Sequence, residues 1–312
     1  MSEPTTPAAG APPAPGAPAA SGVRADVIHD IGYRHYDGPR LGRGYATRSL
    51  YVQSLRGSFG LGRSGKSKIL PMALLALMCL PALIIIAVVI YIKQDHLPVA
   101  VDFPHYLGLM TFVIAVFVAS QAPVAVSRDL RFMTMPLYFS RPLTSSDYAR
   151  AKFGAMATAV MILAGLPMVI LWIGTLLAQM PFLHNLEHFG YGLLAAAFYA
   201  LVYAGIGLLI ASLTPRRGFG VAAIIAVFLI SSAIGGIIYG VVHDQGHEAV
   251  AGWAAAISPS LLIDTTVNWI SRMPERGTPD MPSAFAGVVF IAEILLLSAA
   301  SYGLLVRRYR KI

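Results

Sequence analysis

The sequence predicts an all-α membrane protein that crosses the bilayer six times. Hydrophobic residues make up 56% of the 312-residue chain and charged residues only 12%, with a mean hydropathy of +0.67. Six apolar runs are long enough to cross a hydrocarbon core of about 30 Å as helices. The runs do not alternate polar and apolar residues as membrane β-strands do. We therefore expect helices, which satisfy their own backbone polar groups within lipid. The predicted spans are residues 69–92, 106–126, 153–177, 189–213, 219–242 and 283–306.

The distribution of Lys and Arg predicts how the chain lies in the membrane. Twenty of the 23 basic residues fall before the first span, in the loops after the second and fourth spans, or in the tail. Because basic loops stay in the cytoplasm, both termini are predicted there, in a multi-pass protein of the cytoplasmic membrane. This asymmetry and contact with anionic lipid account for the net charge of +8. The charge therefore gives no reason to expect a nucleic acid partner.

Two segments precede the predicted transmembrane domain, residues 69–312. Residues 1–23 are rich in Ala and Pro and are expected to be a disordered cytoplasmic tail. Residues 24–68 form a cytoplasmic segment that ends in an amphipathic helix. Its apolar stripe begins at Leu50 and Tyr51 and continues through Val52, Leu55 and Phe59. Such a helix either lies at the membrane surface as an elbow before the first span or packs on a partner.

The stretch "GLGRSGKS", Gly60 to Ser67, matches the P-loop pattern of nucleotide-binding proteins. A working P-loop follows a strand and opens a helix within an α/β domain. Here only 68 residues precede the first predicted span, and the residues after Ser67 enter the membrane at once. We therefore interpret the stretch as a glycine-rich hinge and expect no catalytic residue and no cofactor site in this chain.

The longest basic loop, Ser127 to Phe153, has two parts. Its first part mixes charge with apolar residues up to Phe139, and Pro142 then interrupts any helix. Thr144 and Asp147 have the spacing of a capping box, which predicts the start of the third membrane helix. A partly apolar loop on the cytoplasmic side is either a docking surface or a segment resting on lipid headgroups.

This loop, Asp129 followed by "MPLYFSRPLTSSDYARAKF", resembles the corresponding loop of ABC-2-type ABC transporter permeases. The earlier stretch "IGYRHYDGPRLGR" is similar to the start of actinobacterial members of that family. The six spans, the amphipathic elbow and a short extracellular helical hairpin before the last span fit the same pattern. The resemblance covers nearly the whole chain from Val27 onward.

The resemblance implies that the chain is the permease subunit of an ATP-driven exporter. A separate cytoplasmic ABC ATPase subunit would bind ATP and Mg²⁺, and a second copy or a paralogue would complete a dimer. The loop would couple ATP hydrolysis to transport. The coupling residues expected from the resemblance are Arg128, Asp129, Leu137, Tyr138, Ser140 and Arg141.

Glu293 is the only acidic residue deep in a predicted span. An ionised carboxylate there costs at least about 2.5 kcal/mol, so its side chain must face protein or a wet cavity. It either lines a substrate path or makes a polar contact, for example with Gln121. The alternative function is a secondary carrier, driven by an ion gradient, with Glu293 as its coupling residue. A membrane enzyme acting on lipid is a third class, for which the cytoplasmic loops offer too few acidic or His residues.

Three further patterns lie in the fifth span and on the outer side. Gly236 and Gly240 have a G-x-x-x-G spacing, which suits close helix packing either in a dimer seam or within one chain. The apolar pieces of residues 248–282 are too short to span and predict a hairpin in the outer leaflet. The pairs His184/His188 and His243/His247 have i,i+4 spacing, but a metal site needs both pairs to meet, so we predict none.

Overall fold

The structure is a computed structural model. It describes residue 38 and residues 41–62, 64–94, 102–132, 138, 140, 143–214, 216–272 and 279–311. The chain divides into two units, residues 1–40 and residues 41–312. Every helix below belongs to the second unit. The predicted tail, residues 1–23, lies outside the described residues.

Within these ranges the elements are helices, and no strand is present. Five helices are long and apolar enough to cross a membrane, which makes the chain a multi-pass membrane protein. These five are α2 (Lys66–Gln94), α7 (Ser145–Leu177), α8 (Phe182–Leu213), α9 (Arg217–Asp244) and α12 (Ala284–Tyr309). They correspond to five of the six predicted spans, and each is longer than its apolar run. At the start of α7, the predicted capping box between Thr144 and Asp147 is present.

The second predicted span is not one continuous helix. The structure places α3 (Phe103–Leu109) and α4 (Thr111–Ala125) there, with a bend of 56° between them. The hydroxyl of Thr111 donates a hydrogen bond to the carbonyl oxygen of Leu107 at 3.2 Å, so a side chain competes with the backbone at the break. The 15 residues of α4 reach only about 22 Å. The pair therefore crosses a membrane only if both pieces form one bent span.

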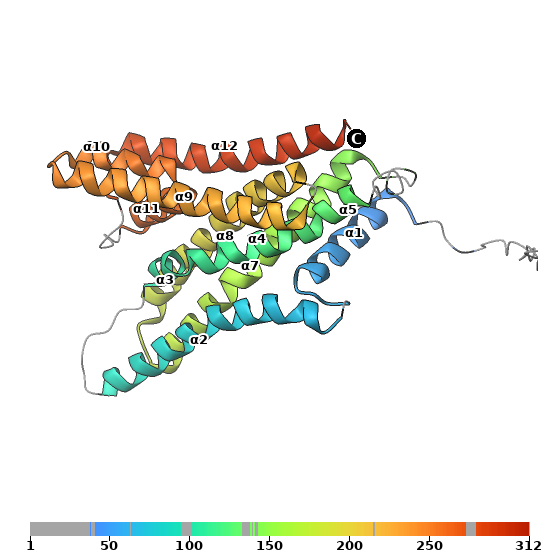
Figure 1. The fold of residues 1–312 in the computed structure, drawn as a ribbon. Helices are drawn as coiled ribbons and strands as arrows, with labels where there is room; N and C mark the ends of the chain where they lie inside the picture. Colours follow the sequence, from blue (N-terminus) through green and yellow to red (C-terminus); the bar gives the residue numbers. More distant parts are fainter. Residues whose placement is uncertain are drawn as a thin grey trace, which may run out of the picture. The chain divides into compact units, whose positions relative to one another are not determined.

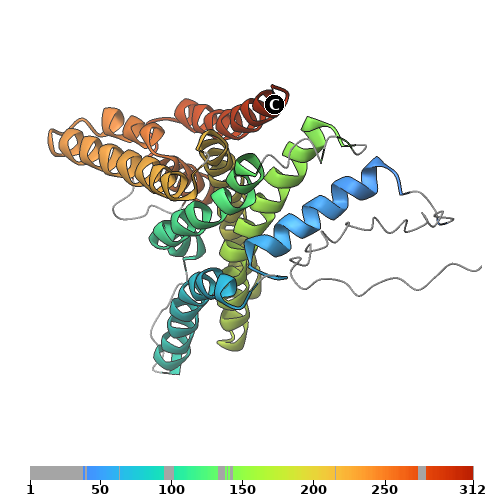
Figure 2. The same cartoon turned by 45° about the vertical axis from the view of Figure 1, so that its right-hand side comes forward.

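The helices α7 and α8 form the centre of the bundle and pack most extensively against each other. In both views α2 and α12 lie on opposite sides of this pair (Figure 1, Figure 2). Small residues permit the close approaches between helices. A Cβ atom at Gly207 of α8 would overlap the side chain of Val118 in α4, so only glycine fits at this contact.

Between α9 and α12 the chain forms α10 (Glu248–Gly252), the 3₁₀ helix η1 (Trp253–Ile257) and α11 (Pro259–Ser271). Pro259 occupies the first turn of α11, as its position after Ser258 suggests. The hydroxyl of Ser258 does not cap the helix but lies 3.1 Å from that of Ser232 in α9. The α11 helix packs against α3, α8, α9 and α12, so it is part of the bundle rather than a surface loop.

The predicted amphipathic helix is α1 (Arg43–Ser58), and its apolar stripe meets protein. Leu50 is buried, Tyr51 and Leu55 are half-buried, and Val52 is exposed. The Tyr51 hydroxyl donates a hydrogen bond to Thr158 of α7 at 2.9 Å. Phe59, directly after the helix, packs its ring against Phe117 of α4 at 5.7 Å between centroids. Most of the stripe is therefore occupied by α7 and α4.

We expect the substitution Gly207→Ala to destabilise the protein. The added methyl group overlaps Val118, and forcing extra carbon into a packed contact typically costs about 1–3 kcal/mol. The matched control is Gly190→Ala in the same helix, because no described atom lies within 4 Å of a Cβ atom there. Thermal unfolding of the purified protein in detergent measures both. Equal melting temperatures for the two variants would show that α4 and α8 do not approach as described.

Candidate functional site

The candidate site lies where the short helix α5 (Ser127–Arg131) follows α4. The hydroxyl of Ser127 donates a hydrogen bond to the carbonyl oxygen of Ala211, near the end of α8, at 2.9 Å. This bond fixes the start of α5 on the bundle. Asp129, two residues later in the same turn, then faces α7.

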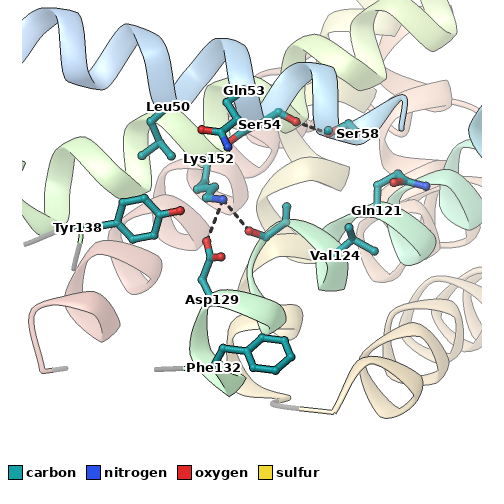
Figure 3. A pocket seen from close by; sticks show the side chains of 12 residues that line it. Leu50, Gln53, Ser54, Ser58, Gln121, Val124, Asp129, Phe132, Tyr138 and Lys152 are labelled. Carbon is teal, nitrogen blue, oxygen red and sulfur yellow. Dashed lines mark hydrogen bonds and ion pairs between the residues drawn. The ribbon is translucent and has the colours of Figure 1, made fainter. Parts of the chain in front are cut away.

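Asp129, Tyr148 and Lys152 form what we call the α5–α7 polar cluster. The ammonium group of Lys152 lies 3.0 Å from the carboxylate of Asp129 and donates a hydrogen bond to the carbonyl oxygen of Ala125 at 2.8 Å (Figure 3). The hydroxyl of Tyr148 donates to the same carboxylate at 2.6 Å. The side chain of Lys152 is 8% exposed, so its charge depends on these acceptors rather than on water.

Aromatic rings extend the polar cluster in two directions. The ring of Tyr148 lies 5.5 Å from that of Tyr138, in the segment after α5, and 5.0 Å from that of Tyr309, at the end of α12. Tyr148 and Tyr309 meet edge to face, an arrangement that aromatic pairs favour. The loop, the start of α7 and the end of α12 are therefore joined at one place.

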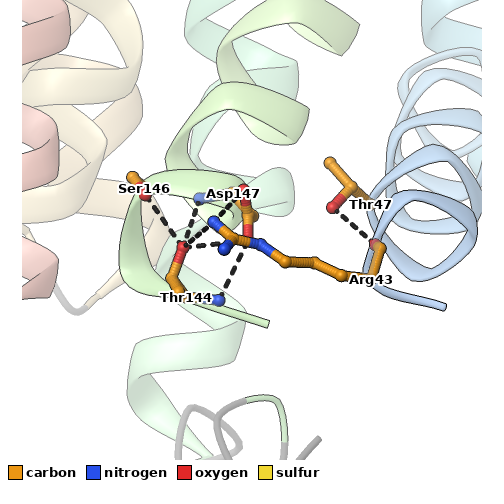
Figure 4. Close-up of polar contacts among 5 residues, drawn as sticks. All are labelled: Arg43, Thr47, Thr144, Ser146 and Asp147. Atoms are coloured by element: carbon orange, nitrogen blue, oxygen red, sulfur yellow. Dashed lines mark hydrogen bonds and ion pairs between the residues drawn. The ribbon is translucent and has the colours of Figure 1, made fainter. Parts of the chain in front are cut away.

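A second ion pair ties α1 to the start of α7. The guanidinium group of Arg43 binds both carboxylate oxygens of Asp147, at 2.5 and 3.0 Å, and also reaches the hydroxyl of Thr144 (Figure 4). The same carboxylate accepts a hydrogen bond from the backbone N–H of Thr144 in the capping box. Arg43 is more than half exposed, so this pair fixes geometry more than it adds stability.

A cavity of about 320 Å³ opens beside the α5–α7 polar cluster (Figure 3). Residues from α1, α4, α5 and α7 line it, and many of them are polar. The buried Gln121 of α4 donates a hydrogen bond to Ser120, and its amide also faces this cavity. The lining residues are Leu50, Gln53, Ser54, Gly57, Ser58, Gln121, Val124, Ala125, Asp129, Phe132, Tyr138 and Lys152.

The structure brings together some of the residues that the resemblance implies for coupling ATP hydrolysis to transport. Asp129 is in the polar cluster and Tyr138 contacts Tyr148, whereas Ser140 is exposed. Leu137, Arg141 and the side chain of Arg128 lie outside the described residues. Sequence analysis missed Tyr148, Lys152 and Tyr309. A signal for Lys152 was present, because a basic residue that enters an apolar helix needs a partner.

The residues singled out within the spans make fewer contacts. Glu293 is half-buried in α12, and among the described residues no hydrogen bond or ion pair to it is found. Gln121 bonds to Ser120 instead, so the expected contact between Gln121 and Glu293 is not made. Gly236 and Gly240 face open space within the described chain, so they are not used in packing within it.

The glycine-rich stretch is a turn between α1 and α2. Gly60 and Gly62 have positive φ angles, +69° and +82°. A Cβ atom at Gly60 would lie 2.5 Å from the carbonyl oxygen of Ser67, so glycine is required where the turn folds back on α2. The turn follows a helix, whereas a P-loop follows a strand.

The histidine pairs do not form a common site. The Nε2 atoms of His184 and His188 lie 3.0 Å apart, and His243 stacks on Tyr239. Across the described parts of the chain, no group of three or more His, Cys, Asp or Glu side chains is placed to hold a metal ion.

A scan of known protein families and a search of curated proteins found no match to this chain.

We expect Asp129→Asn to lower the stability of the folded protein strongly. The change leaves the Lys152 ammonium group in a buried place without its carboxylate, which typically costs about 3–5 kcal/mol. Adding Lys152→Met should restore most of the loss, because the unpaired charge is then removed. The control is Arg43→Gln, at the exposed ion pair, with an expected cost below about 1 kcal/mol. Thermal unfolding in detergent measures both variants. A melting temperature of Asp129→Asn that is no lower than that of Arg43→Gln would contradict the buried ion pair.

Proposed function

We propose that this chain is the membrane permease subunit of an ATP-driven exporter of the ABC-2 type. The α5–α7 polar cluster is the observation that carries the proposal. It joins the loop expected to meet an ATPase to the start of α7 through Asp129, Tyr148 and Lys152. A loop that rests only on lipid headgroups needs no such connection to the bundle.

In this proposal the chain spans the membrane six times, with α3 and α4 together forming the second, bent span. Tyr309 at the end of α12 contacts Tyr148 at the start of α7, and Ser127 bonds to Ala211 near the end of α8. These contacts gather the basic loops and the basic tail at one end of the bundle, as the positive-inside rule requires of a cytoplasmic face. Both termini are then cytoplasmic, α1 is the elbow at that surface, and α10 to α11 form the outer hairpin.

The polar cluster also suggests how motion passes into the membrane. A displacement of α5 by a bound ATPase pulls on Lys152 through Asp129, because separating a buried ion pair is costly. Lys152 and Tyr148 both lie in the first turns of α7, and Tyr148 also contacts α12 through Tyr309. The loop therefore moves these two helices together, which is the kind of rigid-body change that alternates access.

The remaining parts of the transporter come from other chains. ATP and Mg²⁺ belong to the separate ATPase subunit, and no catalytic residue is assigned to this chain. A second permease, either a copy or a paralogue, completes the transport path. Gly236 and Gly240 support a helix contact of this kind, because their open side on α9 allows another helix to approach closely.

Purification of the tagged chain from its native membranes tests the proposal. A soluble subunit with a genuine P-loop should co-purify and hydrolyse ATP, and Tyr138→Ala with Arg141→Glu should reduce its recovery at least tenfold. The control is Arg272→Glu, a charge reversal in the outer segment. Recovery of no ATPase with the unmodified chain would refute the proposed function and favour a secondary carrier. Full recovery with the loop variant would remove this loop from coupling.

A further inference from the structure

A second polar cluster, which sequence analysis did not anticipate, joins α11, α8 and α4. The carboxylate of Asp264 in α11 accepts a hydrogen bond from the hydroxyl of Tyr199 in α8 at 2.7 Å. The hydroxyl of Thr111, at the start of α4, lies 2.8 Å from the same Tyr199 hydroxyl. Thr111 is also the first residue after the break at which the second predicted span bends. Close polar contacts therefore connect an acidic group to the break between α3 and α4.

Asp264 has no cationic partner among the described residues. The helices packed against α11 present Tyr199 and Tyr203 from α8, and Gly108 from α3, where a Cβ atom would lie 3.3 Å from the carboxylate. The helix α12 meets α11 at Gly287, almost two turns before Glu293. The helix α9 contributes Ser232, and η1 carries no ionisable side chain. The negative charge of Asp264 is thus uncompensated by protein, unlike that of Asp129.

The protonation of Asp264 reflects these surroundings. Burial raises the pKa of its carboxyl group to about 7, while the hydrogen bond from Tyr199 acts in the opposite direction. The group is mostly protonated below about pH 6 and mostly ionised above about pH 8. The residue keeps some exposed surface, but it does not itself line the cavity beside this cluster.

A cavity of about 270 Å³ lies next to this cluster, and Gly108 and Thr111 form part of its wall. Its other walls are mainly apolar, with the rings of Phe112 and Phe228 among them. Tyr203, Ser232 and Ser260 also line it, and the hydroxyl groups of Ser232 and Ser260 lie 2.7 Å apart. Leu109, Phe112 and Leu229 are 64%, 60% and 55% exposed, so the cavity opens on the outer surface of the bundle.

We infer that this cavity binds an apolar molecule that carries a protonated amine. The apolar body fits between Phe112 and Phe228, and the amine donates hydrogen bonds to the hydroxyl oxygens at the polar end. The carboxylate of Asp264, behind Gly108 and Thr111, attracts the positive charge across low-dielectric surroundings. An anion is disfavoured by the same carboxylate, and a neutral alcohol gains nothing from it.

This inference adds the cargo class to the proposed function, but the binding site itself rests only on the geometry around Asp264. If the chain is an exporter, hydrophobic amines entering from the membrane are its substrates. If it is not, the same cavity remains an amine-binding site that a binding measurement detects.

The test uses two fluorescent probes that differ only in their head group, dansylcadaverine, a primary amine, and the matching dansyl alcohol. Each is titrated onto the full chain in phosphatidylcholine nanodiscs, with empty nanodiscs subtracted. At pH 8 the amine should bind about tenfold more tightly than the alcohol, because only the amine gains from the ionised carboxylate. At pH 6, where Asp264 is mostly protonated, this preference should largely vanish while alcohol binding stays the same.

Variants separate the contribution of Asp264 from general effects. Asp264→Asn should abolish the preference for the amine at pH 8 and leave alcohol binding intact, whereas Asp264→Glu should retain the preference. The matched control Asp280→Asn changes an exposed carboxylate elsewhere on the outer segment and should alter nothing. Leu229→Trp, at the mouth, should weaken both probes equally.

Equal affinity of the unmodified chain for both probes at pH 8 would overturn the inference, as would a preference that persists in Asp264→Asn. The pH comparison needs no variant, so the inference stays testable even if Asp264→Asn fails to fold. Amine binding together with no co-purifying ATPase would leave the site standing and refute only the exporter.

Discussion

A charged group inside an apolar helix bundle must be given a partner, and the two polar clusters of this chain meet that requirement differently. Asp129 and Lys152 neutralise each other. Asp129 also accepts a hydrogen bond from Tyr148, and Lys152 donates one to the carbonyl oxygen of Ala125. That arrangement locks α5 to α7. Asp264 has one hydroxyl donor, and its charge is left for a proton or a ligand. A fixed connection and a site open to binding therefore follow from the same energetic rule.

The two clusters lie at different positions along the bundle. The first joins the basic loop to α7 and, through Tyr309, to α12. The second joins α11 to the break between α3 and α4, beside a cavity that opens on the side of the bundle. The helix α8 links them, since Ala211 near its end holds α5 and Tyr199 within it holds Asp264. In the proposed exporter, a force applied at the loop would reach the cavity through this helix.

Much of the fold could be predicted from the sequence, because long apolar runs admit little other than helices in a membrane. The starts of α7 and α11 were also predictable, since Thr144, Asp147 and Pro259 act through their nearest neighbours. The bend at Met110 was not. Residues 106–126 form one apolar run in the sequence. A hydropathy profile does not reveal the Thr111 hydrogen bond that accompanies the break.

The candidate site was only partly predictable, for a related reason. Asp129 and Tyr138 were expected from the resemblance of the loop, but Lys152 and Tyr148 lie on the next helix and join them only after folding. Asp264 escaped notice because a segment too short to span was expected to remain near the outer surface, whereas α11 packs inside the bundle. Long-range pairings of this kind are set by packing between helices, which one sequence does not specify.

ATP hydrolysis by the purified chain alone tests most directly whether energy comes from a different subunit. We predict no turnover above that of a mock preparation, and turnover only in fractions that contain a separate ATPase. ATP hydrolysis by the isolated chain that Lys66→Ala abolishes would show that the turn at Gly60 to Ser67 is a working nucleotide site, and would contradict the account.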